Sequence, residues 1–171
     1  MQFLTKDQCL AWTSAQGFPF DGRPDHRILE DTGFHHTHCP TPADSGARVA
    51  LARFLWNTLS DRSERLLWVT EWSVWPSSEH MPLNSALRQA FGETRHLIDV
   101  PGHLFQLGED ETGLSFYVVA MLFFWDAYLL GAGGDFLAFI SHDEYGVVMT
   151  RDVGEGIVLE QQLAKLTKPA A

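Results

Sequence analysis

The chain is poor in cysteine, in basic residues and in long apolar runs, and each shortage excludes a class of protein. It has 2 cysteines in 171 residues, so an extracellular scaffold held by disulfides is not expected. Lys and Arg total 12 against 22 Asp and Glu, which gives a formal net charge of −10. A surface of that sign repels phosphate backbones and anionic lipid, so we expect neither nucleic-acid nor membrane binding.

No segment has the character of a membrane span or of a signal peptide. The longest apolar run, residues 116–125, is about half the length that a membrane-spanning helix needs, and Asp126 ends it. The N-terminus lacks a basic patch followed by an apolar stretch. We therefore expect a cytoplasmic protein. We expect no cofactor, because no glycine-rich nucleotide-binding pattern opens a helix.

What the sequence does contain is the composition of a folded core. Hydrophobic residues make up 45% of the chain and aromatic residues 12%, which is ordinary for a globular protein. A chain of this length fits one domain, and neither a linker nor an internal repeat interrupts it. We expect a single domain covering residues 1–171.

Helix signals recur along the chain. Thr5 and Gln8 have the spacing of a capping box, which predicts a helix over residues 6–16. The acidic start at residues 109–111 and the apolar spacing after it favour a helix to about residue 122. Further helices are expected from Asp44 or Ser45, from Pro82 or Leu83 to Gly92, and over residues 159–166.

Strand signals concentrate in the last third of the chain. Two apolar runs, residues 123–130 and 136–141, flank a glycine turn and predict a buried β-hairpin, which a strand over 146–150 extends. Residues 66–75 predict an earlier strand, with Leu66, Trp68, Thr70, Trp72 and Val74 facing the core and Leu67, Val69, Glu71, Ser73 and Trp75 on the other face. Short strands are also expected around residues 27–30 and on both sides of the turn at 100–102.

The order of these elements predicts an α+β fold, with helices packed on one face of a mainly antiparallel sheet. Ionisable groups then lie at the end of the hairpin, in the run Ser141-His-Asp-Glu144. His142 beside Asp143 has the residue types of an oriented general base. Neighbours in a strand point to opposite faces, so we expect no direct contact between these two residues. The simpler interpretation is a turn in which Ser141 and Asp143 bond local backbone groups.

Asp126 directly follows the aromatic run at residues 123–125. A buried carboxylate must be paired, because an isolated buried charge is costly by several kcal/mol. We expect a hydrogen bond to a neighbouring loop or an arginine partner, with Arg88 and Arg95 as candidates. The functional interpretation is a pocket carboxylate, and His103 is a further candidate for the same site.

The most concentrated set of metal-ligand residue types is His35-His-Thr-His38-Cys39, with His26 nearby. Zinc needs three or four converging ligands, and the motifs that supply them on a helix or a knuckle are missing. We expect a solvated, histidine-rich loop and no metal. The alternative is a site in which His36, His38 and Cys39 contribute ligands.

A third candidate surface is the aromatic and polar segment that follows the strand at 66–75. Trp75 and Glu79 are its candidate binding residues, because aromatic side chains that face away from a core often anchor interfaces. Core packing of Trp75 is the competing interpretation.

Four short segments carry a resemblance to known proteins. They are Trp75-Pro-Ser-Ser-Glu79, Pro101-Gly-His-Leu-Phe105, Trp125-Asp126 and Ser141-His-Asp-Glu144. Through them the chain resembles small bacterial single-domain proteins of unknown function. The C-terminal hairpin is also similar to that of immunity proteins that neutralise secreted toxins. This resemblance implies an acidic α+β domain that acts by binding, and it transfers no functional residue.

We therefore expect a non-enzymatic protein-binding domain, of the immunity type, whose acidic surface attracts a basic protein. The alternative is a hydrolase-like or metal-dependent enzyme that uses His142, Asp143, Asp126 and His103, and it requires these groups to converge in one cleft. A structural or assembly role stays open, and the sequence predicts no oligomeric state.

Overall fold

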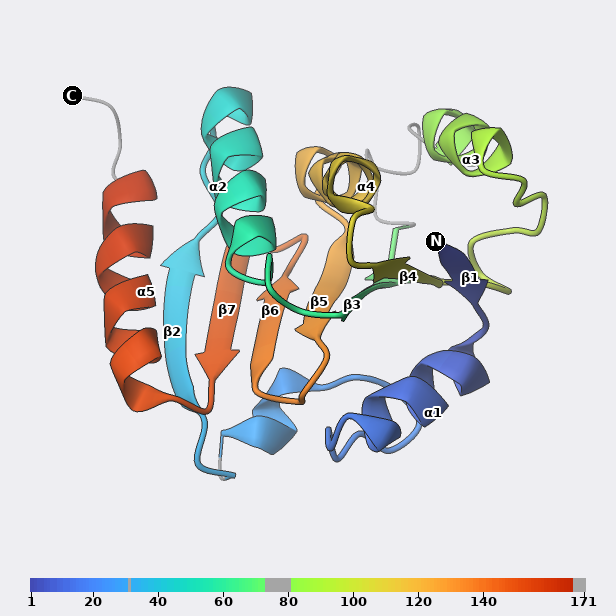
Figure 1. Cartoon of the computed structure of the whole chain (residues 1–171). Helices are drawn as coiled ribbons and strands as arrows, with labels where there is room; N and C mark the ends of the chain where they lie inside the picture. The colour runs from blue at the N-terminus through green and yellow to red at the C-terminus, as the bar shows by residue number, and fades with distance from the viewer. Residues whose placement is uncertain (31, 73–80, 168–171) are drawn as a thin grey trace.

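The computed structural model describes residues 1–30, 32–72 and 81–167, which form an α+β fold around an antiparallel sheet (Figure 1). The predicted α+β class with a mainly antiparallel sheet is confirmed. The strands are β1 (Gln2–Leu4), β2 (His35–Pro40), β3 (Glu64–Glu71), β4 (Gly102–Gln106), β5 (Asp126–Gly131), β6 (Phe136–Ile140) and β7 (Tyr145–Thr150). The helices are α1 (Lys6–Ala15), the short 3-10 helix η1 (His26–Leu29), α2 (Ser45–Asn57), α3 (Met81–Ala90), α4 (Asp110–Leu122) and α5 (Val153–Leu166).

Within the described residues the sheet has seven strands in the order β1-β4-β3-β5-β6-β7-β2. Every neighbouring pair is antiparallel. The predicted hairpin is confirmed as β5 and β6, and β7 continues it. The first of these strands starts later than predicted. Phe124 takes a left-handed backbone conformation, with φ 53°, between α4 and β5, so β5 begins only at Asp126.

Both faces of the sheet are covered. Figure 1 shows α2, α4 and α5 together on one side, with α1 and η1 on the other. Leu67 and Val69 of β3 belong to the core under α2, α4 and α5, whereas Leu66 and Trp68 pack with residues of α1 and η1. The sequence prediction of one inward face for this strand is therefore incomplete. A central strand buried on both faces has a continuous apolar run, and alternation then does not separate its two sides.

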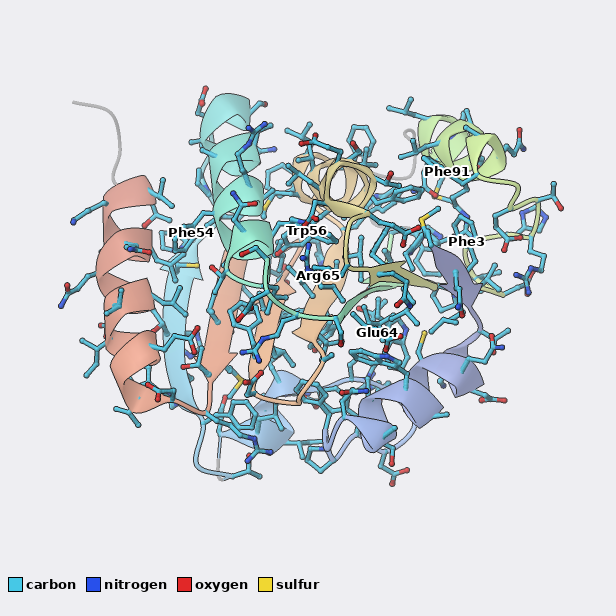
Figure 2. The ribbon with its side chains drawn as sticks, viewed as in Figure 1. Phe3, Phe54, Trp56, Glu64, Arg65 and Phe91 are labelled. Atoms are coloured by element: carbon cyan, nitrogen blue, oxygen red, sulfur yellow. The ribbon has the colours of Figure 1, made fainter. Side chains whose placement is uncertain are left out.

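The core under α2, α4 and α5 contains a buried charge, Arg65 of β3, which is 2% exposed (Figure 2). Its Nε donates to the Leu59 carbonyl at 2.7 Å, its guanidinium pairs with Asp110 at the start of α4, and it lies 5.0 Å from the Trp56 ring. Gly113 allows α4 to approach this cluster, because a Cβ there would come within 2.1 Å of the Trp56 ring.

The capping predictions are confirmed. Thr5 and Gln8 form the capping box of α1, and Asp44 caps α2. The predicted terminal helix is too short, since α5 already begins at Val153, after the cap Asp152. Glycine is a poor helix former, so the glycines in the first turns of α5 hide from sequence reasoning where the helix begins. Gly156 is required by packing, because a Cβ there would come within 2.3 Å of the His35 ring.

Four local predictions are wrong. Residues 27–29 belong to η1, where the Asp25 side chain accepts the Arg27 N–H at 3.0 Å, and Glu30 is the C-cap, so no strand forms there. The histidine-rich segment is strand β2, held by pairing with β7, and not a loop. Residues 96–99 form turns, so only β4 follows the turn at 100–102. Strand β3 ends at Glu71, before Trp72, and residues 73–75 of the predicted strand lie outside the described residues.

None of the helices in residues 1–30, 32–72 and 81–167 combines the length and the apolar character that a membrane crossing requires.

Candidate functional site

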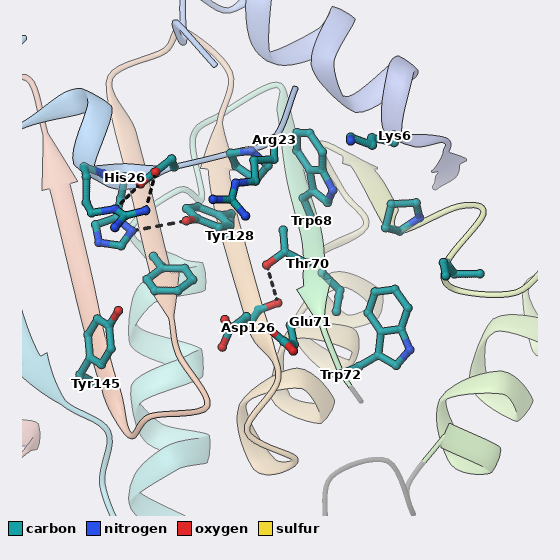
Figure 3. A pocket seen from close by; sticks show the side chains of 17 residues that line it. Lys6, Arg23, His26, Trp68, Thr70, Glu71, Trp72, Asp126, Tyr128 and Tyr145 are labelled. Atoms are coloured by element: carbon teal, nitrogen blue, oxygen red, sulfur yellow. Dashed lines mark hydrogen bonds and ion pairs between the residues drawn. The ribbon is translucent and has the colours of Figure 1, made fainter. Parts of the chain in front are cut away.

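A cavity of about 500 Å³ opens on the face of the sheet that carries α1 and η1 (Figure 3). Side chains of adjacent strands form its floor: Trp68 of β3, Tyr128 of β5 and Phe139 of β6, which are cross-strand neighbours in register. Tyr145 of β7 extends the floor, and residues 23–27 line its other side. The volume falls within the range of sites that hold small organic ligands.

The floor is apolar and neutral. The His26 ring stacks on Phe139 with 4.7 Å between centroids, and its Nδ1 lies 3.4 Å from the Tyr128 hydroxyl. Burial lowers the pKa of His26 below its ordinary value. Burial also raises the pKa of Tyr128 above the usual range. Both groups are therefore uncharged at neutral pH.

A β-bulge brings two carboxylates to one end of this cavity. In the pairing of β3 with β5, Val69 lies opposite Ala127 and Glu71 opposite Asp126, so Thr70 is the extra residue. Strict alternation would put Glu71 on the side of Val69. The bulge instead turns it to the side of Asp126, and both carboxylates line the cavity (Figure 3).

Asp126, at the start of β5, connects this strand to the turn that follows β6. Its Oδ1 accepts the backbone N–H of His142 at 2.6 Å and the ring Nδ1 at 2.8 Å. Burial disfavours a charged imidazole here, but the hydrogen bond and the charge of Asp126 outweigh burial and raise the pKa of His142. The predicted loop partner of Asp126 is therefore confirmed, while Arg88 and Arg95 bond elsewhere.

The carboxylate also fixes the proton of the neutral His142 ring on Nδ1, which leaves Nε2 free to accept. Nε2 lies 3.5 Å from Oδ1 of Asp143, an exposed side chain. The expectation that these neighbours do not meet is wrong, because they lie in a turn and not in a strand. In that turn the Ser141 hydroxyl accepts the Asp143 N–H at 3.2 Å, as the sequence predicted.

Cationic side chains lie at the other end of the cavity, near α1 (Figure 3). Arg27 is held by Asp25, whose oxygens accept its Nε and Nη2 at 2.9 and 2.8 Å. Arg23 has no hydrogen bond or ion pair within the described part of the chain. Its side chain reaches over the floor beside Tyr128 and Trp68.

His103 does not join this site. It lies on β4 opposite Leu67, and its ring packs against Phe116 of α4 at 5.0 Å between centroids, so it is on the far face of the sheet. Its Nε2 is 3.3 Å from Nη1 of Arg88. Complete burial, with the charge of Arg88, lowers the pKa of His103 to about 3. The predicted set of four therefore divides into His142, Asp126 and Asp143 on one face and His103 on the other.

The histidine-rich strand does not gather its three candidate ligands. His36 and His38 are exposed on one face of β2, with ring centroids 5.8 Å apart. Cys39 is buried in the core on the opposite face, where burial raises the pKa of its thiol to about 11. A thiol held neutral on the other side of a strand cannot complete a metal site with these histidines. The candidate binding residues Trp75 and Glu79 lie outside the described residues.

Among the described residues, Glu71, Asp126 and His142 form the group that could hold a metal ion. One ligand atom from each lies within 4.8 Å of the others. Two carboxylates and an imidazole suit zinc or manganese. Nδ1 of His142 already shares its proton with Asp126, so a cation bound at that nitrogen would have to replace this hydrogen bond.

Sequence reasoning identified Asp126 and His142 but missed Glu71 and Arg23. Strand alternation assigned Glu71 to the wrong face, and no residue pattern signals the bulge at Thr70. Arg23 lies in a stretch rich in Gly, Pro and Asp, and that composition indicates only a loop. Comparison with protein-family models, curated proteins and solved structures gives no match.

Proposed function

We propose that this protein is a non-enzymatic binding protein that holds its ligand in the cavity over β3, β5 and β6. The observation that carries the proposal is the cavity itself, at about 500 Å³ with an aromatic floor and a few polar groups at its ends. Sites for small organic molecules share this combination, because apolar walls supply affinity and sparse polar groups fix orientation.

Binding is favoured over catalysis by what the lining lacks. The described residues around the cavity include no serine or cysteine. The Thr70 hydroxyl donates to the Asp126 carbonyl at 3.2 Å, and Tyr128 is buried beside His26. His142 does not line the cavity, and its free nitrogen faces Asp143. No serine, threonine or cysteine activated by a base therefore faces a ligand from the described lining.

A thermal-shift screen with a chemically diverse set of small molecules tests this proposal. Thr70→Trp places a large ring in the cavity, while Ser115→Trp places the same ring on the exposed surface of α4 and serves as the matched control. We expect ligands that raise the melting temperature of the native protein and of the control, but not of Thr70→Trp. Ligands that stabilise all three equally, or that are chemically converted by the protein, would contradict the proposal.

The proposal includes a second kind of binding, to a basic protein partner. It is supported by the net charge of −10 and by the resemblance to immunity proteins. Acidic side chains also line one end of the cavity, Glu71 and Asp126, and the nearby Asp143 is 72% exposed. We expect a pull-down from the native host to retain a basic protein at low salt and to lose it as ionic strength rises. Recovery of no protein partner at low salt would count against it.

The hydrolase-like alternative is supported by one observation, the contact between Asp126 and His142 with Glu71 beside it. A carboxylate that fixes an imidazole is the arrangement of a general base, and the same three groups could bind a metal. Ester and phosphoester substrates, assayed with and without Zn²⁺ or Mn²⁺, test it. It requires activity that His142→Gln abolishes and that His38→Gln retains, and equal activity in both variants would exclude it.

A further inference from the structure

The charges around the cavity are balanced in number but separated in space. Its described lining holds three basic residues, Lys6, Arg23 and Arg27, and three acidic residues, Asp25, Glu71 and Asp126. Asp25 and Arg27 neutralise each other through two side-chain hydrogen bonds. What remains is a basic end beside α1 and an acidic end at the bulge (Figure 3).

The basic end offers an arginine that the protein itself does not use. Arg27 is paired, but Arg23 has no partner among the described residues, and it is exposed at the cavity. A guanidinium is a planar fork of donors that matches a carboxylate, so its preferred partner is a planar anion. Lys6 lines the same end and adds a second positive charge.

The acidic end offers acceptors that the protein leaves open. Asp126 uses Oδ1 for both of its bonds to His142. Its Oδ2 and the Glu71 carboxylate take no hydrogen bond within the described ranges. An ammonium group carries three donors and no acceptor, so it can bond to both carboxylates at once.

The floor of the cavity beside Arg23 is uncharged. Trp68 and Tyr128 flank Arg23 (Figure 3), and both side chains are at least nine-tenths buried. A ligand held by Arg23 therefore contacts an aromatic surface. Rings and methylene groups bury apolar area on such a surface and prefer offset or edge contacts with it.

We infer that the cavity binds a zwitterion whose carboxylate and ammonium groups lie at opposite ends of a short apolar or aromatic body. The carboxylate pairs with Arg23, the ammonium bonds to Glu71 and Asp126, and the body lies over Trp68 and Tyr128. Dipeptides and amino-substituted aromatic acids belong to this class. The inference rests on the proposed binding function and specifies its ligand.

Calorimetric titration with three matched probes tests the inference. Para-(aminomethyl)benzoate carries both charges, para-toluate carries only the carboxylate, and para-methylbenzylamine carries only the ammonium. We expect the first to bind about two- to fivefold more tightly than either of the others, because Arg23 and Glu71 are exposed, and ion pairs to exposed side chains are partly screened by water. Dipeptides with free ends are expected to show the same preference over dipeptides with blocked ends.

Two variants assign the ends. Arg23→Gln is expected to bind para-(aminomethyl)benzoate no more tightly than para-methylbenzylamine, and Glu71→Gln is expected to reduce its advantage over para-toluate. Arg53→Gln and Glu111→Gln, both exposed on helices away from the cavity, are the matched controls and should retain the full preference. Loss of preference in the controls as well would overturn the assignment.

The outcomes separate this inference from the binding function itself. If Thr70→Trp abolishes binding of other small molecules while neither the doubly charged probe nor the free dipeptides are preferred, the cavity is a binding site and the zwitterion inference is wrong. If no compound distinguishes Thr70→Trp from Ser115→Trp, both the binding function and the inference fail.

Discussion

Two histidines lie on opposite faces of the sheet, each beside a different charged residue. Their environments shift their pKa values in opposite directions. His142 is paired with Asp126 at the mouth of the cavity, with 27% of its side chain exposed. His103 is 1% exposed and lies beside the buried Arg88. The pKa of His142 is raised, because Asp126 outweighs the effect of burial, whereas burial and Arg88 lower the pKa of His103 to about 3.

This comparison shows that a histidine near a charge is not by itself a sign of chemistry. Arginine can only donate, so Nε2 of His103 must accept from Arg88 and the ring stays neutral. The contact therefore joins α3 to β4 and has a structural role. His142 is able to gain a proton because its neighbour is an anion and water reaches it. The sign of the neighbour and the exposure of the ring decide which histidine belongs to a site.

The largest effect is expected on the buried side, from Arg88→Met. The Arg88 guanidinium donates to the Val100 carbonyl at 3.0 Å and lies 3.3 Å from His103, and the side chain is 2% exposed. Its removal leaves buried acceptors unpaired, so we expect a loss of about 3 kcal/mol in the free energy of unfolding, measured with urea. Arg53→Met, on the exposed face of α2, is the control and should change stability by less than about 0.5 kcal/mol. An equal effect of the two substitutions would remove the structural role from Arg88.

The second effect is a loss of stability in acid that depends on His103. The folded state keeps this ring neutral down to a pKa of about 3, while the unfolded chain protonates it near its ordinary pKa. The contribution of neutral His103 to the free energy of unfolding is therefore fully present above roughly pH 6.5. It is lost as the pH falls, with a slope of up to about 1.4 kcal/mol per pH unit. Urea unfolding at a series of pH values should show a shallower acid slope in His103→Leu. An unchanged slope would mean that this histidine does not cause the loss.

The sequence was sufficient for the parts of the fold that depend on local signals. The capping box at Thr5, the cap at Asp44 and the glycine turn after residue 130 each predicted an element that the structure contains. It was not sufficient where distant segments determine the structure. Strand β2 has a polar, histidine-rich sequence and exists because β7 pairs with it. Both faces of β3 are buried because α1 returns across the sheet, and the apolar run of β3 does not show which element covers each face.

The candidate site divides in the same way. Asp126 and His142 were identified from sequence because a carboxylate and an imidazole interrupt apolar strands, and polar groups at strand ends are conspicuous. Glu71 needs the bulge at Thr70, which breaks the alternation on which sequence reasoning relies. The three-dimensional path of the loop before η1 brings Arg23 to the cavity, and the sequence does not indicate this path. The sequence thus located one end of the cavity and gave no indication of the other.

The third effect concerns the open side and should be smaller. In Asp126→Asn, His142 loses the charge that favours its protonated form, so its pKa should fall from its raised value, as measured by NMR titration of the ring. The pKa of His103 should not change, because that ring is on the other face. A fall of both values would indicate a general change of structure and not the loss of one pair.

Asp126→Asn should also lower the free energy of unfolding by about 1 kcal/mol. The pH dependence of this loss should be opposite to that of the His103 contribution. A histidine whose folded pKa is raised stabilises the protein fully below its unfolded pKa and loses this contribution as the pH rises through the folded pKa. The difference in the free energy of unfolding between the native protein and Asp126→Asn should therefore be larger at about pH 6 than at about pH 8. Urea unfolding of both proteins at these two pH values measures it. A difference that grows with pH would contradict the assigned pair.

The smallest effect is expected from Arg23→Gln, and its smallness is informative. Arg23 is exposed and has no partner among the described residues, so the free energy of unfolding should change by less than about 0.5 kcal/mol. Arg27→Gln, which breaks the exposed pair with Asp25, should also have a small effect, because water screens surface ion pairs. A loss above about 1 kcal/mol in Arg23→Gln would show that the fold itself uses this guanidinium. In that case Arg23 would resemble Arg88, and the open side of the sheet would have no arginine free to receive a ligand.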